Sequence, residues 1–390
     1  MHKGLHRGGP LLLRRRGVTV PVGSRRPPAA GPHNALIDVP GIRVGHHTAV
    51  GDGFLTGTTV VLAPDGGMTA GVDVRGAAPG THETDLLHPT ASVQSIHALV
   101  LSGGAAYGLA ACTGVMDGLA ERGIGLPVGP GAGEVVPLVP GAVIFDLGRG
   151  GDFRARPTAD FGRIALAAAL GDGSDGSQAA RSDATAVGSL GAGTGAVTSN
   201  LKGGLGQASV VLPGGVVVAA LAVTNAAGSP IDPTNGELLG ARLLIPADGR
   251  PPGSPAAGPL EELLAITSRR PERPLFSAEQ AQQAQAIGNT TLAVVATDAG
   301  LTKTQCNKLA AVAQNGIARA LNPVNTMVDG DAVFAVATGG SDPPDLLAFH
   351  EILTAAANVV TRAIVRALLG VAGTSTPAGQ WSSWRDVAEG

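Results

Sequence analysis

The sequence predicts an α/β protein of the α+β kind, in which antiparallel sheets pack against helices. Short apolar runs rich in β-forming residues, each bounded by Gly or Pro, recur along the chain of 390 residues. Helical apolar patterns alternate with these runs, most clearly after residue 290. The turn Pro213-Gly214-Gly215 separates two apolar runs, which is typical of a hairpin and favours antiparallel pairing over a doubly wound parallel sheet.

Composition indicates a globular chain with a sizeable core. Hydrophobic residues make up 44% of the sequence and charged residues 15%, and the 59 glycines indicate many tight turns and closely packed layers. The two cysteines, Cys112 and Cys306, cannot build a disulfide framework and fall in apolar helical patterns. Both are therefore expected to be buried thiols, which suits a reducing, cytoplasmic setting.

Charge is distributed unevenly along the chain. Residues 1–35 carry seven Lys or Arg and no acidic residue, so the remainder has a net charge of −10, since the whole chain carries −3. This acidic remainder argues against nucleic acid as the main partner, and no run of eighteen apolar residues is present to span a membrane. We expect residues 1–33 to be a disordered basic leader, with a targeting or nucleic-acid-binding arm as the alternative, and residues 34–390 to form a single domain.

The first half of the chain carries short strands, one helix and a long loop. The strands are predicted over residues 58–63, 96–101 and 142–145. A helical pattern runs from Tyr107 to Leu119 and stops at Gly123, because glycine commonly ends a helix. Residues 171–206 are rich in Gly, Ser and Thr and are predicted to be a long loop that could line a site, with Gly191–Gly195 as a flexible part.

The middle of the chain combines a hairpin, a linker and two helical pieces. The hairpin strands are predicted over residues 208–212 and 216–223. A proline-rich stretch over residues 246–259 is predicted to be a surface linker. Helical pieces over residues 260–268 and 277–286 follow it.

After residue 290 the elements are longer and clearer. A buried strand over residues 291–297 precedes a helix capped by Thr302, where Gln305 completes a capping box. The apolar stripe of this helix is formed by Cys306, Leu309, Ala310, Ala313, Ile317, Ala320 and Leu321. A strand over residues 333–337 follows, and a helix from Leu346 to Leu369 closes at Gly370.

The junction Asn289-Thr290-Thr291 feeds directly into the apolar strand. A threonine at the edge of a buried strand has its hydroxyl held in place by the sheet. If the Asn289–Thr290 bond were cleaved, the new α-amine of Thr290, with an intrinsic pKa of about 8, could accept the proton of its own hydroxyl. Taken alone, the motif is more typical of an ordinary strand start.

Seven motifs that are separated along the chain extend this observation. They are Asp38–His46, Gly71–Gly76, Leu101–Leu109, Val143–Leu147, Asn289–Thr297, Leu301–Lys303 and Asp329–Ala335. In the same order, they resemble the L-aminopeptidase/D-esterase family, which includes β-aminopeptidases and nylon-oligomer hydrolases. The resemblance covers Asn34 to about Leu369. It implies a four-layer αββα sandwich, self-cleavage into fragments 34–289 and 290–390, and tetramers of processed protomers. It also implies hydrolysis of small amides or peptides, a class that includes 6-aminohexanoate oligomers.

The resemblance also implies the residues of the site. Thr290 would be the nucleophile, Lys202 would lower the pKa of the nearby α-ammonium, and Asn225 would support the oxyanion. Asp329 and Asp331, two residues apart on an extended chain, would face the amine and the hydroxyl together. Without the resemblance, Lys202 would be interpreted as a charged loop residue and Asn225 as a turn residue. The acid pair would be interpreted as part of an Asx turn.

Some positions leave the site's details open. Tyr107, within one of the matching motifs, is a candidate substrate contact. The family's usual His-Thr before the acid pair and Thr after it are replaced by Asn325-Thr326 and Ala332, so substrate contacts are expected to differ there. The hydroxyl of Thr291 leaves a cleavage point shifted by one residue as an alternative.

Other hydrolase and binding classes lack their signatures. Five residues of types that bind metals lie close together in the sequence. They are His46, His47, His82, Asp85 and His88. Their spacing is not that of a zinc-binding helix, so neither a metal nor another cofactor is expected. The Gly-x-Ser-x-Gly elbow and the phosphate-binding P-loop are both absent from the sequence. Two alternatives stay open, an acyltransferase of the ornithine acetyltransferase type and an inactive scaffold.

Overall fold

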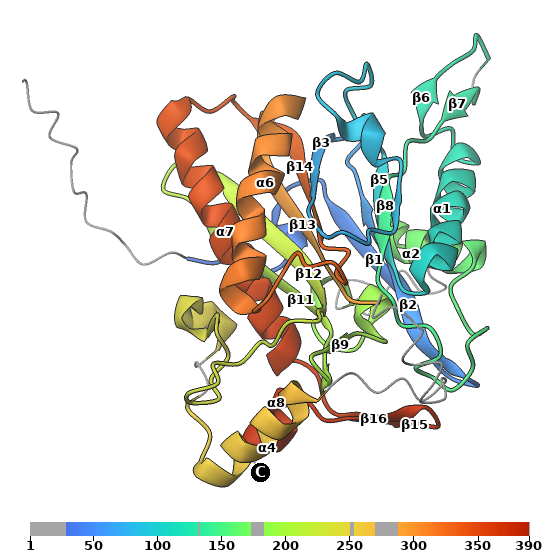
Figure 1. The fold of residues 1–390 in the computed structure, drawn as a ribbon. Helices are drawn as coiled ribbons and strands as arrows, with labels where there is room; N and C mark the ends of the chain where they lie inside the picture. Colours follow the sequence, from blue (N-terminus) through green and yellow to red (C-terminus); the bar gives the residue numbers. More distant parts are fainter. Residues whose placement is uncertain (1–28, 132, 173–182, 250–252, 270–287, 390) are drawn as a thin grey trace, which may run out of the picture.

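Two five-stranded sheets lie face to face at the centre of the molecule, and helices cover the outer face of each (Figure 1). The structure is a computed structural model that describes residues 29–131, 133–172, 183–249, 253–269 and 288–389. Sheet I has the strand order β1-β2-β5-β8-β4, and sheet II has the order β11-β12-β13-β14-β3. Helices α1 and α2 cover sheet I, whereas α6 and α7 cover sheet II.

The elements of these layers have the following bounds. Sheet I consists of β1 (Arg43–Gly51), β2 (Phe54–Leu62), β4 (Thr81–His82), β5 (Ala98–Ser102) and β8 (Gly141–Val143). Sheet II consists of β3 (Thr69–Val74), β11 (Leu205–Val211), β12 (Val217–Asn225), β13 (Thr290–Ala299) and β14 (Ala332–Ser341). The covering helices are α1 (Ala110–Ala120), α2 (Ala159–Leu170), α6 (Lys303–Ala320) and α7 (Leu346–Leu369).

Smaller elements surround the sandwich. Three short strand pairs are β6 (Leu126–Pro127) with β7 (Val135–Val136), β9 (Val197–Thr198) with β10 (Leu201–Lys202), and β15 (Thr374–Thr376) with β16 (Gly379–Trp381). Two further helices, α4 (Ala257–Ser268) and α8 (Trp384–Ala388), pack against each other at the end of the molecule opposite β6 and β7 (Figure 1).

Three separate apolar layers hold the sandwich together. Leu292 and Val294 of β13 lie between the two sheets, whereas Ala293 and Val295 lie under α6 and α7. A third cluster, which includes Val115, joins sheet I to its helices. Each buried Leu or Val side chain contributes about 1.5–3 kcal/mol relative to its exposed state. The alternation along one strand therefore builds two interfaces at once, and the four-layer αββα architecture implied by the sequence is confirmed.

Glycines let the helices approach the sheets closely. A Cβ at Gly206 in β11 would lie 2.0 Å from the carbonyl oxygen of Ala363 in α7. A Cβ at Gly45 in β1 would lie 2.2 Å from the carbonyl oxygen of Ala165 in α2. Contacts this short are not possible, so glycine is required where strand and helix backbones meet. This close packing accounts for part of the glycine content of the sequence.

Each sheet contains one parallel pair, which differs from the antiparallel sheets that the sequence predicts. Strands β13 and β14 are parallel and are joined by α6, and β5 and β8 are parallel and are joined by α1. A helix between two strands returns the chain to the starting end of the sheet, so the next strand runs in the same direction. The predicted hairpin β11–β12 is antiparallel, as expected.

Local signals are confirmed where they are strongest. Helix α7 has the predicted bounds, and Thr302 caps α6 in a capping box with Gln305. The prediction that Gly191–Gly195 is a flexible loop is wrong, because these residues are buried and Gly191–Gly193 form a 3-10 helix that contacts strands of both sheets. A Cβ at Gly195 would lie 2.1 Å from the carbonyl oxygen of Leu55, so the glycines here serve packing. The predicted helix over 277–286 lies outside the described residues.

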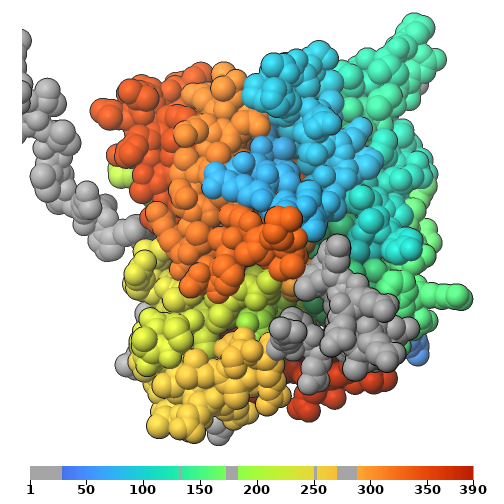
Figure 2. Space-filling view, viewed as in Figure 1, coloured from blue at the N-terminus to red at the C-terminus, as the bar shows by residue number. Residues whose placement is uncertain are grey.

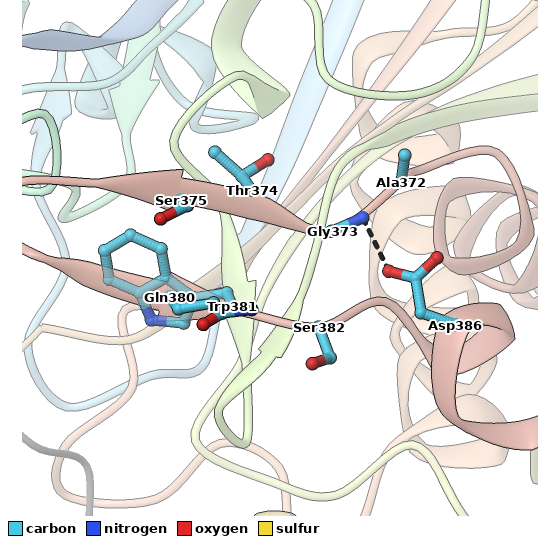
Figure 3. A pocket seen from close by; sticks show the side chains of 8 residues that line it. All are labelled: Ala372, Gly373, Thr374, Ser375, Gln380, Trp381, Ser382 and Asp386. Atoms are coloured by element: carbon cyan, nitrogen blue, oxygen red, sulfur yellow. Dashed lines mark hydrogen bonds between the residues drawn. The ribbon is translucent and has the colours of Figure 1, made fainter. Parts of the chain in front are cut away.

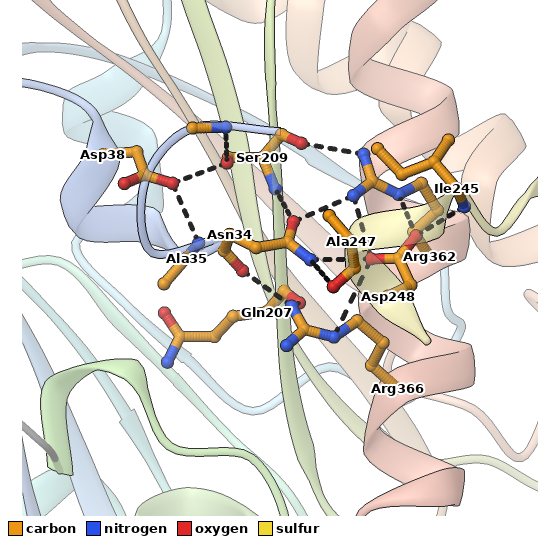
Figure 4. Close-up of polar contacts among 11 residues, drawn as sticks. Asn34, Ala35, Asp38, Gln207, Ser209, Ile245, Ala247, Asp248, Arg362 and Arg366 are labelled. Carbon is orange, nitrogen blue, oxygen red and sulfur yellow. Dashed lines mark hydrogen bonds and ion pairs between the residues drawn. The ribbon is translucent and has the colours of Figure 1, made fainter. Parts of the chain in front are cut away.

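A buried ionic cluster ties the start of the described chain to α7 (Figure 4). Arg362 of α7 bonds to Asp248 at 2.6 Å and donates from Nη2 to Oδ1 of Asn34 at 2.8 Å. The side chain of Asp248 is 0% exposed, although it lies in the segment that was predicted to be a surface linker. Asn34 also donates to Asp248, and Arg366 donates to the carbonyl oxygen of Asn34.

Contacts with the fold include residues before Asn34. Ala29 forms a β-bridge with Val211, and the N–H of Gly31 donates to Oγ of Ser209 at 2.9 Å. The last residues assigned to the leader therefore lie along β11. Helix α7 is long and apolar enough to cross a membrane by composition alone, but 72% of its most apolar window is buried inside the fold. It forms part of the core that covers sheet II.

Candidate active site

Thr290 and Asn225 stand directly opposite each other at one end of sheet II. Thr290 is the first residue of β13 and pairs in register with Asn225, the last residue of β12. Paired residues of antiparallel strands point to the same face. Since Leu292 and Val223 occupy that face between the two sheets, Thr290 and Asn225 both point toward the edge of the inter-sheet layer. The strand pairing thus brings together two of the predicted site residues.

The carbonyl group of Asn289 lies against the Thr290 hydroxyl. Oγ1 of Thr290 donates to the Asn289 carbonyl oxygen at 2.6 Å, and the N–H of Gly330 donates to the same oxygen at 2.8 Å. A Cβ at position 330 would lie 2.7 Å from Oγ1 of Thr290, so only glycine leaves room for the hydroxyl. A hydroxyl thus lies beside a carbonyl whose oxygen already accepts a backbone N–H.

Asp329 and Asp331 hold the backbone around this junction. Asp331 accepts from the N–H of Thr291 at 2.6 Å and from the N–H of Asn325 at 2.9 Å. Asp329 forms a parallel bridge with Asn289, and its carboxylate accepts from the N–H of Ala227 and from both the N–H and the hydroxyl of Thr326. In this uncleaved chain, the described hydrogen bonds of the acid pair go to these groups and not to Thr290.

Burial affects the titration of Asp331. It raises the pKa of the carboxyl to about 6, and the neighbouring negative charge of Asp329 raises it further, while the N–H groups of Thr291 and Asn325 oppose the shift. A carboxyl that titrates near neutral pH can exchange a proton during catalysis. The carboxyl lies beside the junction, and the role of the acid pair toward the amine and the hydroxyl of Thr290 stays a prediction.

The loop that carries the acid pair packs against the segment after β3. The N–H groups of Gly76 and Ala78 donate to the carbonyl oxygens of Asp331 and Asp329 at 3.1 and 2.9 Å. On the surface, the orange segment that follows β13 in the chain lies beside the blue segment that follows β3 (Figure 2). Two parts of the chain far apart in sequence therefore meet at the acid pair.

The side-chain amide of Asn225 is fixed on one side only. Its Oδ1 accepts from the N–H of Val197 at 3.1 Å and from Nη1 of Arg149 at 2.5 Å. Its Nδ2 is buried and has no hydrogen-bond partner in the described part of the chain. A buried N–H donor without a partner costs free energy, which makes it available to an oxygen of a substrate.

Lys202 lies fully buried on β10, beside the strand that contacts Asn225. Its Nζ donates to the carbonyl oxygens of Ala196 and Gly203 at 3.1 and 2.6 Å. Burial lowers the pKa of the ammonium group to about 7, and the positive charge of Arg149 lowers it further, whereas Asp146 opposes both. The lysine is linked to the site through Val197, its register neighbour, and has no direct hydrogen bond to Thr290.

Two groups at this end of the sandwich were not singled out from the sequence. Burial raises the pKa of Asp146 to about 6, although hydrogen bonds, one of them from the N–H of Gly104, and the charge of Arg149 lower it. Asp146 lies within a motif that carries the resemblance, and Arg149 follows three residues later in a glycine-rich turn. Their position just after the end of β8 is the signal that could have found them.

Tyr107 lies at the surface, on the 3-10 helix Ala105–Leu109. Its side chain is 53% exposed, and the guanidinium of Arg156 stacks 3.6 Å from the centre of its ring. Its contact with substrate stays a prediction. Among the described residues, no group of three or more His, Cys, Asp and Glu is arranged to hold a metal ion.

A hollow of about 420 Å³ lies beside the C-terminal hairpin and is lined mainly by polar groups (Figure 3). Trp381 and Gln380 come from β16, and Asp386 of α8 accepts from the N–H of Gly373. The carbonyl oxygen of Ser382 accepts from the N–H of Lys202 at 2.8 Å. The hollow therefore lies next to β10, the strand of Lys202, and Thr290 is not among the residues that line it.

Comparison with known proteins shows the family. The model of peptidase family S58 matches residues 34–381. The chain belongs to peptidase family S58. An uncharacterized aminopeptidase of Mycobacterium leprae is 41% identical over 90% of this chain and 95% of its own length. A 6-aminohexanoate-oligomer endohydrolase of a Kocuria species is 32% identical over 81% of this chain and 78% of its own length.

Solved structures support the fold of this S58 peptidase. A Burkholderia β-aminopeptidase superposes with a TM-score of 0.65 at 23% identity, over 93% of this chain and 96% of that one. The L-aminopeptidase D-Ala-esterase/amidase of Ochrobactrum anthropi, described as a variant of the Ntn hydrolase fold, has a TM-score of 0.65 at 19% identity, over 94% and 96% of the two chains. By its family and its relatives in sequence, the protein is an S58 hydrolase that acts on amide or peptide bonds, and its substrates are small amides or peptides.

Proposed function

We propose that this S58 hydrolase cleaves its own Asn289–Thr290 bond and then uses the exposed N-terminal Thr290 to hydrolyse amides. The observation that carries the proposal is the junction itself. The Thr290 hydroxyl touches the carbonyl group of Asn289, Gly330 donates to that carbonyl oxygen, and the free amide N–H of Asn225 lies across the strand pair. The nucleophile, the bond to be broken and two N–H donors thus meet at one end of β13.

Self-cleavage follows from this arrangement. Oγ1 of Thr290 attacks the carbonyl carbon of Asn289 and gives up its proton, and negative charge develops on the oxygen that accepts from Gly330. The intermediate collapses by breaking the bond to the Thr290 nitrogen, which takes up the proton and becomes an amine. The resulting ester is hydrolysed by water to the Asn289 carboxylate and the Thr290 hydroxyl.

Turnover repeats the same chemistry on a substrate amide. The α-amine of Thr290 accepts the hydroxyl proton as Oγ1 attacks the substrate carbonyl carbon, and the amine product leaves with that proton. Nδ2 of Asn225 donates to the developing oxyanion. Lys202 lies behind Asn225 as the register neighbour of Val197, and burial and the charge of Arg149 lower its pKa to about 7. In its charged form it would lower the pKa of the α-ammonium of Thr290 and so favour the neutral amine. Water then releases the acid product and restores Thr290.

The cleavage point is tested by sequencing the small fragment. Purified protein should contain two associated fragments, and N-terminal sequencing of the smaller one should read Thr-Thr-Leu-Ala-Val. Intact mass should give fragments that end at Asn289 and begin at Thr290. A small fragment that starts at Thr291 or Leu292, or a single chain after long incubation, would show that Thr290 is not the nucleophile.

We propose a small amide with a free amino end as the substrate. The aminopeptidase relatives support a free amino end, and the 6-aminohexanoate-oligomer endohydrolase supports a small amide. The carboxylates of Asp329 and Asp331 supply negative charge near Thr290. Acetylation of the substrate amine should then raise KM clearly, which paired assays of free and acetylated 6-aminohexanoate oligomers can measure. Equal KM for the two would reject recognition of the amine and favour an endo-acting amidase. The family match gives no support to the acyltransferase alternative.

Assembly and cellular setting belong to the same proposal. Tetramers of processed protomers are supported by the family resemblance. A reducing cytoplasm is supported by Cys112 and Cys306, both of which are buried free thiols. Burial raises the pKa of each thiol to about 12, so neither is expected to react with oxidants readily.

A further inference from the structure

The guanidinium of Arg149 lies on the carbonyl side of the Asn225 amide. We propose that Arg149 is a positioning residue that fixes Asn225 with its N–H group facing the oxygen of the substrate carbonyl. This inference rests on the proposed function, because it assigns a purpose to the oxyanion donor of that reaction. It concerns a different element of the chain, the turn that follows β8 of sheet I.

The two partners of Oδ1 determine which way the amide is turned. A backbone N–H and a guanidinium can only donate hydrogen bonds, so both can bind only the oxygen of the amide. The N–H of Val197 and Nη1 of Arg149 occupy Oδ1 at 3.1 and 2.5 Å, and Nδ2 is left on the other side. A reversed amide would place its NH2 group against two donors and lose both hydrogen bonds. Arg149 therefore helps to hold the donor in position before substrate binds.

Charge adds to this geometric effect. A positive group on Oδ1 withdraws electron density from the amide, so its N–H becomes a stronger donor to an oxyanion. The gain appears when negative charge develops on the substrate oxygen, not in the ground state, and so it lowers the barrier for the chemical step. The effect of Arg149 should therefore fall on kcat and leave KM nearly unchanged.

Arg149 is itself held in place by contacts with two other parts of the chain. Its Nη1 also donates to the carbonyl oxygen of Gly195 at 2.5 Å, and its own carbonyl oxygen accepts from Oγ1 of Thr376 at 2.6 Å. Gly148 and Gly151 on either side have positive φ angles of 76° and 116°, which favour glycine and allow the tight turn. Thr376 lies on β15, in the C-terminal hairpin. The arginine is thus a built part of the site and not a mobile surface charge.

A double-mutant cycle tests the proposal. We would compare Arg149→Met, Asn225→Ala and the double variant, with kcat expressed per mole of processed small fragment. Asn225→Ala should lower kcat by about 100-fold or more, as for other oxyanion donors. Arg149→Met should lower kcat by about 10-fold to 100-fold with KM within about threefold, and the double variant should be no slower than Asn225→Ala alone. Arg149→Lys, which keeps a charged donor, should recover part of the loss.

The outcomes separate this inference from the proposed function. If Asn225→Ala leaves kcat unchanged, the oxyanion assignment in the proposed function is wrong. If Asn225→Ala lowers kcat but Arg149→Met does not, or if the two losses multiply, the role of Arg149 is overturned. Arg149→Met should still self-cleave, because the Asn289 carbonyl is held by Gly330, and an uncleaved or insoluble chain would also overturn the proposal. Arg163→Met, an exposed arginine on α2, is the matched control and should keep full kcat.

Discussion

Thr290→Ala is expected to give a single folded chain of 390 residues without hydrolytic activity. The substitution removes the hydroxyl that touches the Asn289 carbonyl group, and no other described hydroxyl donates to that oxygen. Folding should be retained, because alanine fits a position where the side chain is small and 5% exposed. Denaturing gel electrophoresis and an assay of amide hydrolysis on the same preparation measure both effects.

Two variants serve as controls for this result. Thr290→Ser keeps the hydroxyl and should still process, more slowly if the methyl group helps to orient Oγ1. Thr291→Ala should process normally, because side chains alternate along β13 and the Thr291 side chain points to the face opposite that of Thr290. If Thr290→Ala still splits into the same two fragments, the cleavage comes from another protease and the N-terminal-nucleophile mechanism is wrong.

Arg362→Met is expected to cause the largest loss of stability. Arg362 is 3% exposed and pairs with Asp248, which is 0% exposed, so the substitution leaves a buried carboxylate without its main partner. Removing one partner of a buried pair costs about 3–5 kcal/mol in the free energy of unfolding. Chemical denaturation in the Thr290→Ala background, where one uncleaved chain unfolds, measures the change.

The contribution of the Arg362–Asp248 pair to stability should also depend on pH. Burial raises the pKa of Asp248, but the hydrogen bond and charge of Arg362 oppose this, together with hydrogen bonds from the N–H of Ile245 and from Asn34. The folded pKa therefore lies below the ordinary value. A carboxyl with a lowered pKa stabilises the fold above its ordinary range, and this contribution is lost as the pH falls through the folded pKa. Arg362→Met should therefore remove stability at neutral pH and weaken its further loss on acidification.

Matched variants distinguish the buried charge from simple loss of packing. Adding Asp248→Asn to Arg362→Met removes the unpaired charge and should restore part of the stability. Arg163→Met breaks an exposed pair with Asp117 and should barely change it. If Arg362→Met is as stable as Arg163→Met, the cluster in Figure 4 does not hold the N-terminal segment to α7.

Local chemistry explains which elements could be predicted from the sequence. The cap at Thr302 and the apolar stripe of α6 involve residues within a few turns of each other, so the pattern alone specifies them. The parallel pairing of β13 with β14 and the burial of Asp248 depend on partners far along the chain, such as Arg362. The partners are too far apart for any local sequence pattern to contain both. The stretch around Asp248 is rich in proline, so its composition alone predicts a surface linker.

The site divides in the same way. The resemblance pointed to Thr290 and Asn225, which the register of β12 and β13 places opposite each other. The position of Arg149 after β8 could be read from the sequence, but its role could not. That role arises from a hydrogen bond to Asn225, a residue 76 positions away on the other sheet. Gly330 was part of a matching motif, but its effect on the Thr290 hydroxyl needs the loop in three dimensions.

The strand order of sheet II has a consequence for the processed protein. Strands β13 and β14 belong to the fragment after Asn289, yet they lie between β12 and β3 of the other fragment. Once the proposed cut is made, neither fragment can complete sheet II alone, and the released pair would expose two unsatisfied strand edges. Unfolding then becomes dissociation of two chains, so its midpoint should rise with protein concentration. Refolding of the precursor involves one chain, whereas refolding of the cleaved enzyme requires the two fragments to associate.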